Sequence, residues 1–195
     1  MDYFLALLLT VFLFHLSIAA HEGGHAAFGW MRGHRPDEAV IGWGFPLRFK
    51  ARGVPIRIGM FPMAGSVEFR ALFEAENPEG NRTLARDKFL IALGGPVGSV
   101  VAALGFFALG GIDPERAFVW GVFGVINVLI AVMNLVPLPP LDGWRILEAG
   151  LELKGIRVWR DREQRDRIYR AGFFIAVAGM ILAIPFLVGI RESVS

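Results

Sequence analysis

Four long apolar stretches, separated by polar segments, dominate the hydrophobic pattern of this chain. They cover residues 3–31, 89–111, 117–141 and 168–190. A helix needs about 20 apolar residues to cross the hydrocarbon core of a bilayer, so each stretch is a candidate membrane span. One such stretch could equally be a buried core helix, but four leave too little polar sequence to cover them all. The pattern therefore predicts an all-α polytopic membrane protein with about four transmembrane helices.

The connection after the first span follows a different pattern. Residues 39–69 alternate β-branched and aromatic residues with arginines, and Gly53, Val54 and Pro55 indicate a turn. We expect a small membrane-associated β-hairpin or sheet here. Its aromatic residues, such as Trp43 and Phe45, suit a position at or within the interface.

The remaining connections are shorter or amphipathic. Residues 112–116 are too few to form a domain between the second and third spans. Residues 144–167 predict an amphipathic helix on the cytoplasmic surface. The whole chain, 1–195, is therefore expected to form a single domain embedded in the membrane.

Composition supports a membrane protein, since 54% of the residues are hydrophobic and the mean hydropathy is +0.51. The chain has no cysteine, so a metal would have to be held by His, Asp or Glu. A signal peptide is an alternative for residues 4–20, but no basic residue precedes that apolar run.

Basic residues give an expected orientation. Of the 20 Lys and Arg residues, only Arg116 and Arg191 lie outside segments 32–88 and 144–170. By the positive-inside rule, both segments face the cytoplasm and both termini face outward. The basic pI of about 9.4 then reflects topology, and no nucleic-acid partner is expected.

The chemical signal is the sequence HEGGH at residues 21–25, at the end of the first span. On a helix, His21 and His25 share one face and can offer imidazole nitrogens to one ion. Glu22 lies about 100° around the helix, beside that ion and free to act as a general base. Gly23 and Gly24 leave room for another backbone. The alternative is a buried polar network that holds the helices together.

A catalytic zinc site needs a third protein ligand, for which Asp142 is the best candidate. It lies in NLVPLPPLDGW, residues 134–144, where three prolines forbid a regular helix. Irregular backbone at membrane depth is tolerated where it is buried or lines a wet cavity. A helix end capped by Asp142 is the competing explanation. His15 is expected to be an interior hydrogen-bonding residue, and His34 a solvated interface residue.

HEGGH on the first span and NLVPLPPLDG on the third together resemble the site-2 protease family of intramembrane zinc metalloproteases. The resemblance extends to IGWGFPLRF and IGMFPMAGSVEF, similar to the membrane-associated hairpin of the family, and to ALGGPVGSVVA, similar to its Gly-Pro span. Two features differ from the family pattern. No PDZ domain fits between spans two and three, and Ser99 occupies a position where the Gly-Pro motif often has Asn.

The resemblance implies one Zn²⁺ per chain, with His21, His25 and Asp142 as ligands, Glu22 as the base, and Asn134 contacting the substrate backbone. It implies hydrolysis of peptide bonds within transmembrane segments, for regulation or for clearance of signal-peptide remnants. The expected partners are the lipid bilayer, a substrate transmembrane helix and, in place of a PDZ domain, an accessory protein. The expected location is a bacterial inner membrane.

Two other functions fit parts of the sequence. A non-proteolytic adaptor for transmembrane helices would need a groove but not Glu22. A zinc carrier would distribute polar groups along several spans, whereas here they gather at one level.

Overall fold

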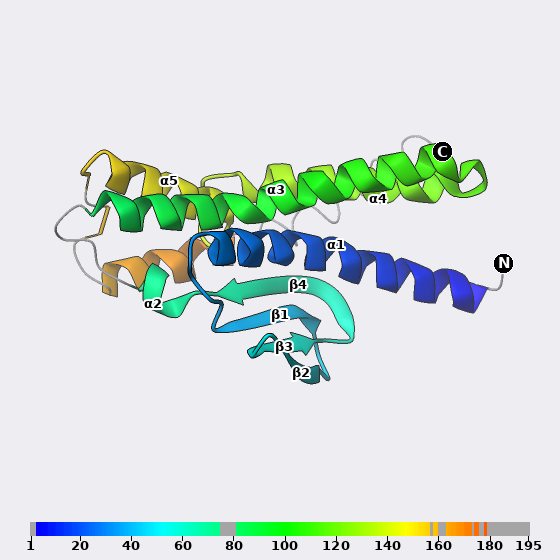
Figure 1. The fold of residues 1–195 in the computed structure, drawn as a ribbon, viewed down its shortest axis with the longest axis horizontal. Coiled ribbons are helices and arrows are strands. Elements are labelled where there is room, and N and C mark those ends of the chain that lie inside the picture. The colour runs from blue at the N-terminus through cyan, green and yellow to red at the C-terminus, as the bar shows by residue number, and fades with distance from the viewer. Residues whose placement is uncertain are drawn as a thin grey trace.

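The computed structural model describes residues 3–74, 81–156, 158–159, 163–172, 174–175 and 178. Three long helices run side by side through it, with a small sheet against the first of them (Figure 1). They are α1 (Tyr3–Met31), α3 (Arg82–Ile112) and α4 (Ala117–Asn134). The shorter helices are α2 (Arg70–Phe73), η1 (Pro114–Arg116) and α5 (Asp142–Leu153).

Three helical segments among the described residues are long and apolar enough to cross a membrane: Tyr3–Met31, Arg82–Ile112 and Pro114–Asn134. They agree in length and composition with the first three predicted spans, with corrected ends. The second begins earlier, at Arg82, because the Asn81 side chain accepts hydrogen bonds from the Thr83 and Leu84 amides. Most of the predicted fourth span, 168–190, lies outside the described residues, although residues 163–172 are helical.

The expectation of a span over 117–141 is wrong at its C-terminal end. Helix α4 ends at Asn134, and residues 135–141 form turns before α5 begins at Asp142. Pro137, Pro139 and Pro140 cannot donate backbone hydrogen bonds, so a helix cannot continue through them. The chain therefore forms an irregular link here, and α5 packs against α3.

The segment after α1 forms a four-stranded sheet, one of the two forms expected for it. Its strands are β1 (Glu38–Trp43), β2 (Leu47–Ala51), β3 (Val54–Ile58) and β4 (Phe61–Glu68), in the order β2-β3-β1-β4. The hairpin consists of β2 and β3, which turn at Arg52 and Gly53 with φ of 50° and 77°. Val54 and Pro55, which the sequence assigned to the turn, belong to β3.

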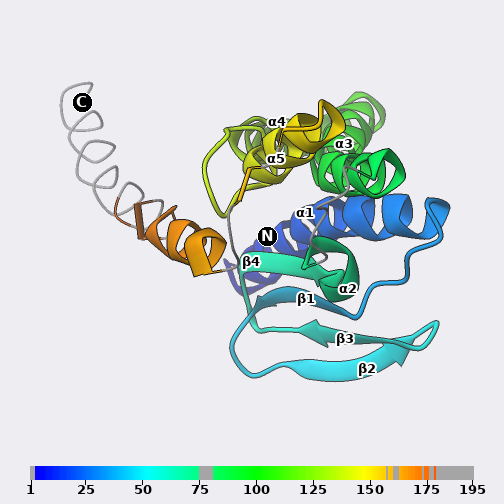
Figure 2. The same cartoon turned by 90° about the vertical axis from the view of Figure 1, so that its left-hand side faces the viewer.

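Strand β1 lies between β3 and β4, parallel to the first and antiparallel to the second. The order places β4 at one edge, next to α1, and β2 at the other edge, farthest from the helices (Figure 2). Val67, Phe69, Leu72 and Ile91 form a core that joins β4, α2 and α3. The sheet is thus fixed to the helices at its β4 side.

Helices α1 and α3 approach each other closely through small residues. A Cβ placed on Gly24 would lie 2.0 Å from the Gly94 carbonyl oxygen, and one on Gly98 would lie 2.3 Å from the Ala20 carbonyl oxygen. Only glycines permit this contact between backbones. The expected role of Gly24 is confirmed, whereas Gly23 faces open space.

Candidate metal centre

Helix α1 presents His21 and His25 on one face, toward α3 and α5. Their rings lie 5.1 Å apart and nearly perpendicular, at 87°. Both residues are buried, at 6% and 7% exposure. The four-residue spacing alone predicts a shared face, and the tertiary structure adds that this face is covered.

Asp142, the first residue of α5, brings its carboxylate to both imidazoles. Its Oδ2 lies 3.0 Å from His21 Nε2 and 3.1 Å from His25 Nε2. The side chain does not cap α5, whose N-cap residue is Leu141 and has no side-chain capping bond. The competing explanation of Asp142 as a simple helix cap is therefore wrong.

These three atoms suit a tetrahedral ion. Zinc bonds of about 2.0–2.2 Å to His nitrogen and carboxylate oxygen separate neighbouring ligand atoms by about 3.4 Å. The observed 3.0–3.1 Å is close to that separation. Among the described residues, His21, His25 and Asp142 form a group of potential ligands that could hold a metal ion. Two imidazoles and one carboxylate also match the chemistry of catalytic zinc sites, which leave a fourth position open.

The outer ring nitrogens have their own partners, which orient the rings. His21 Nδ1 lies 2.9 Å from Ser99 Oγ, and His25 Nδ1 lies 2.7 Å from the Ile91 carbonyl oxygen. A carbonyl oxygen can only accept, so this shorter contact requires the proton on His25 Nδ1 and leaves Nε2 free to bind an ion. The Gly95 amide, 3.2 Å from the same Nδ1, then makes only a longer contact with it. Ser99 was expected to affect only local packing or polar contacts. The structure assigns it a specific contact with a potential ligand.

Glycines make space around this cluster. A Cβ on Gly95 of α3 would lie 2.3 Å from His25 Nε2 and 2.7 Å from His21 Nε2. A Cβ on Gly143 would lie 2.3 Å from the Leu135 carbonyl oxygen, where the chain enters α5. Both positions therefore require glycine. At Gly95 a side chain would fill the space that an ion would occupy, and at Gly143 it would clash with the turn that positions Asp142.

Glu22 lies on the side of α1 that faces the sheet. It is buried, at 7% exposure, and its Oε1 would lie 2.7 Å from a Cβ placed on Gly65 of β4. Gly65 thus lets the edge strand approach Glu22 directly. This arrangement places Glu22 between the His–His–Asp cluster and the edge strand of the sheet.

Contacts at the other end of α5 help to position Asp142. Lys88 of α3 pairs with Glu152 at 3.4 Å, with both side chains largely buried. The Glu148 carboxylate accepts hydrogen bonds from Trp159 Nε1 and from the Tyr169 hydroxyl. Burial raises the pKa of the Glu148 carboxyl above its ordinary value, against the effect of these donors.

Among the described residues, no contact joins Asn134 to His21, His25 or Asp142. Its Nδ2 donates to the Ile130 carbonyl at 3.0 Å, within its own helix.

His15 bonds the Val11 and Gly59 carbonyls, which confirms its expected interior role. His34 was expected to be solvated, but its Nε2 lies 2.8 Å from the buried Asp87, which Arg32 also contacts. The sequence offered no signal for that pairing.

Comparison with known proteins identifies the family. The model of peptidase family M50 matches residues 9–115 and 112–179, which is most of the chain. The chain belongs to this family, the site-2 protease family. Members of the family are membrane proteins, in agreement with the three apolar helices. No PDZ domain separates α3 from α4, which are joined through η1.

Named relatives agree with this assignment. The "Putative zinc metalloprotease Rip2" of Mycolicibacterium smegmatis is 29% identical over 179 residues, 85% of this chain and 64% of the relative. The "Putative zinc metalloprotease YwhC" of Bacillus subtilis is 32% identical over 118 residues, 54% of this chain and 53% of the relative. The "Putative zinc metalloprotease MJ0611" of Methanocaldococcus jannaschii is 43% identical over 61 residues, 30% of this chain and 32% of the relative. The chain spans less than two thirds of the length of each.

Proposed function

We propose that this chain is a zinc endopeptidase that hydrolyses peptide bonds within the transmembrane segments of other membrane proteins. The observation that carries the proposal is the convergence of His21, His25 and Asp142 from two distant parts of the chain, with Glu22 beside them. Membership of the M50 family and relatives named as zinc metalloproteases support it.

His21 Nε2, His25 Nε2 and Asp142 Oδ2 would hold the ion, one per chain. A zinc ion bound there would polarise the scissile carbonyl and lower the pKa of water to about 7. Ser99 and the Ile91 carbonyl keep both rings turned so that Nε2 faces the ion. The Asp142 carboxylate offsets part of the positive charge.

Glu22 would act as the general base. Its carboxylate accepts a proton from the attacking water, whose oxygen forms the new bond to the carbonyl carbon. It then gives that proton to the leaving amine as the peptide C–N bond breaks. Its buried position beside β4 suits a proton carrier that must be shielded from bulk water.

The substrate presents a further requirement, because the carbonyls of a transmembrane helix are held in hydrogen bonds until it unwinds. Strand β4 is at the edge of the sheet and passes Glu22 at Gly65. An unwound substrate segment could pair with β4 and so recover its backbone hydrogen bonds. Asn134, the last residue of α4, would contact the substrate from the opposite side only after its side chain leaves the Ile130 carbonyl.

Glu22→Gln tests the proposal most directly. The amide keeps the shape of the side chain but cannot take the proton. We expect zinc content to remain at one ion per chain while cleavage of a membrane-embedded substrate falls about 10²- to 10⁴-fold. Zinc can be measured by elemental mass spectrometry and cleavage in proteoliposomes. A variant that loses zinc is uninformative for the base and would be replaced by Glu22→Asp, whereas undiminished cleavage contradicts the assignment.

The orientation and the partners remain part of the proposal. We place the β2–β3 turn and the C-terminal end of α5 on the cytoplasmic side of a bacterial inner membrane, and the η1 link outside. Because the chain has no cysteine, single introduced thiols report topology cleanly. Lys154→Cys should react with an impermeant maleimide only from the cytoplasmic side, and Glu115→Cys only from the outer side. An accessory protein that filters substrates would copurify with the Glu22→Gln protein.

A further inference from the structure

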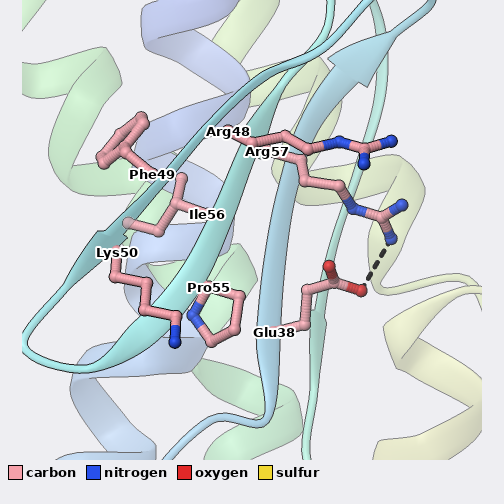
Figure 3. Close-up of a pocket in the computed structure, with 7 residues that line it drawn as sticks. All are labelled: Glu38, Arg48, Phe49, Lys50, Pro55, Ile56 and Arg57. Atoms are coloured by element: carbon pink, nitrogen blue, oxygen red, sulfur yellow. Dashed lines mark hydrogen bonds and ion pairs between the residues drawn. The ribbon is translucent and has the colours of Figure 1, made fainter.

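The outer half of the sheet carries three basic side chains on one face. Arg48 and Lys50 alternate along β2, and Arg57 of β3 is paired directly with Arg48 in the strand register. They line an open hollow of about 360 Å³, shown in Figure 3, whose other charged residue is Glu38. Figure 3 also shows the Arg48 and Arg57 side chains extending in the same direction.

This arrangement is unfavourable for the protein alone. Like charges directly opposite each other on neighbouring strands destabilise a sheet. Glu38 pairs with Arg57 at 2.6 Å and offsets one of the three charges. Within the described part of the chain, no ion pair or hydrogen bond involves the side chains of Arg48 or Lys50. The buried Arg57 Nε also lacks a hydrogen-bond partner there. The positive charges of Arg48 and Lys50 are therefore left for an anion.

The strand ends next to these cations are apolar. Exposed large hydrophobic side chains gather where β1 passes to β2 and β3 passes to β4: Trp43, Phe45, Leu47, Met60, Phe61 and Met63. His15 Nε2 bonds the Gly59 carbonyl at 2.7 Å, so this end of the sheet lies beside the middle of α1. We call these six residues the apolar tip. An exposed aromatic cluster beside a membrane span suits contact with the bilayer at its interface.

The depth of the basic face follows from its neighbours. In the register, Arg48 pairs with Arg57, Arg57 with Val40, and Val40 with Ser66. Ser66 follows Gly65, which touches Glu22. The basic face therefore lies level with the site. Along α3, Gly95 at the site is seven residues, about 10 Å, from Lys88, the last charged residue before the apolar part of that helix.

Long basic side chains can extend from that depth to the phosphate layer. Lys50 lies two strand residues, about 7 Å, farther from the apolar tip than Arg48. At the far end of β2, the Arg52 guanidinium lies 5.7 Å from the centre of the Trp30 ring, near the end of α1. The sheet thus runs from apolar residues, through Arg48 and Arg57, to Lys50 and Arg52, as a segment crossing the interface would.

We propose that Arg48, Lys50 and Arg57 bind the phosphate headgroup of an anionic phospholipid while the apolar tip enters its acyl chains. The headgroup phosphate would neutralise the Arg48–Arg57 repulsion. Since the sheet carries β4 past Glu22, the bound lipid would also set the depth of the site. This inference does not depend on the proposed peptidase activity.

Lipid retention by the full chain tests the proposal. The protein in detergent is titrated with equal amounts of phosphatidylglycerol and phosphatidylcholine, and bound lipid is measured by native mass spectrometry. We expect the wild type to prefer phosphatidylglycerol. The Arg48→Gln/Lys50→Gln protein should bind it about 30-fold more weakly, since each basic group near an anionic lipid surface contributes about fivefold.

Matched controls separate this site from general basicity. Arg82→Gln/Arg86→Gln removes two exposed basic residues near the start of α3 and should leave the preference within about twofold. Arg48→Lys/Lys50→Arg retains both charges and should keep the preference. An unchanged thermal transition without lipid excludes misfolding of the exposed-site variants.

Three outcomes would overturn the proposal. The first is equal loss of phosphatidylglycerol binding in both double variants, or in neither. The second is displacement of the lipid by millimolar inorganic phosphate, which would indicate a site for soluble anions. The third is a Glu-rich peptide that binds the wild type, competes with the lipid and loses binding in Arg48→Gln/Lys50→Gln, which would indicate a protein partner.

Discussion

Two buried polar clusters lie one turn apart on α1, one around Ser17 and one around His21. They differ in which polar atoms remain available to bind something other than the protein. Ser17 donates to the Leu13 carbonyl, and Asn127 of α4 donates to Ser17 Oγ and to the Phe123 carbonyl, each of the last two at 2.8 Å. Both residues are fully buried, and Asn127 Oδ1 alone lacks a hydrogen-bond partner. In this cluster the Ser17 hydroxyl and the Asn127 amide donate their hydrogen bonds to neighbouring protein groups.

The cluster of His21, His25 and Asp142 is arranged in the opposite way. The outer nitrogens bond to the protein, and two Nε2 atoms and one Oδ2 converge on a common point. Burial of polar groups in a span is therefore not sufficient to indicate chemistry, since Ser17 and Asn127 are more deeply buried than the ligands. What distinguishes a metal centre is convergence of acceptor atoms with space left between them.

The largest expected difference between the clusters is in metal binding. Asp142→Ala removes one of three convergent atoms and should reduce zinc from one ion per chain to background, with loss of proteolysis. Asn127→Ala, which removes the amide that donates to Ser17 Oγ in the other cluster, should retain zinc. Elemental analysis of both purified proteins after dialysis measures this. Stoichiometric zinc in Asp142→Ala would show that the ligands have been misassigned.

The second largest difference is expected when a methyl group is added to a glycine of α3, either at the ligand atoms or away from them. A Cβ at Gly95 would fall among the ligand atoms, 2.3 Å from His25 Nε2, whereas one at Gly105 on the same helix meets nothing within 4 Å. Gly95→Ala should therefore displace an imidazole and weaken zinc binding by at least the 10- to 100-fold typical of disturbed ligand orientation. Gly105→Ala should leave it unchanged. Competition with a fluorescent zinc chelator measures both affinities, and equal values would contradict the site geometry.

Two fully buried serines offer the closest matched pair. Ser99 contacts His21 Nδ1, and Ser17 contacts Asn127. Ser99→Ala should weaken zinc binding about 10- to 100-fold, because it removes the partner that orients a ligand. Ser17→Ala should change it less than about threefold. If the two variants have the same zinc affinity, Ser99 acts only in packing.

The smallest expected effect concerns the stability of the Ser17–Asn127 cluster. Hydrogen bonds between helices in membranes contribute about 0.6 kcal/mol on average. Asn127→Leu removes one such bond together with the unpartnered Oδ1, so we expect the unfolding free energy to change by less than about 1 kcal/mol. Reversible unfolding in mixed micelles measures it. A loss of several kcal/mol would contradict this expectation and would mean that the Ser17–Asn127 cluster contributes far more to stability than one interhelical hydrogen bond.

The sequence allowed the three long helices and the members of the candidate site to be predicted. HEGGH places His21, Glu22 and His25 on α1 through helical spacing alone, and the proline run that follows Asn134 predicts an irregular segment ending in Asp142. The same prolines end α4 at Asn134, seven residues earlier than the apolar run suggested, because hydropathy continues where hydrogen bonding cannot. Ser99 was underestimated, since a serine in an apolar helix has no signal of its own.

The sheet illustrates the limit more sharply. Alternation marked residues 39–69 as strands, yet it could not show that β1 inserts between β3 and β4, because side-chain periodicity carries no information about pairing partners. The pairing of His34 with Asp87 was missed for the same reason. Both depend on contacts between residues distant along the chain.

Local order, which depends on neighbours three or four residues away, was determined by the sequence itself: which stretches are helical, that they are apolar enough for a bilayer, and which face carries the histidines. Tertiary structure alone decided that Asp142 Oδ2 meets both Nε2 atoms, that Gly95 keeps the space among them open, and that Arg48 faces Arg57. The reason is physical, since a ligand cluster is a set of distances between separate elements, and those are set only when glycine-rich helix faces pack.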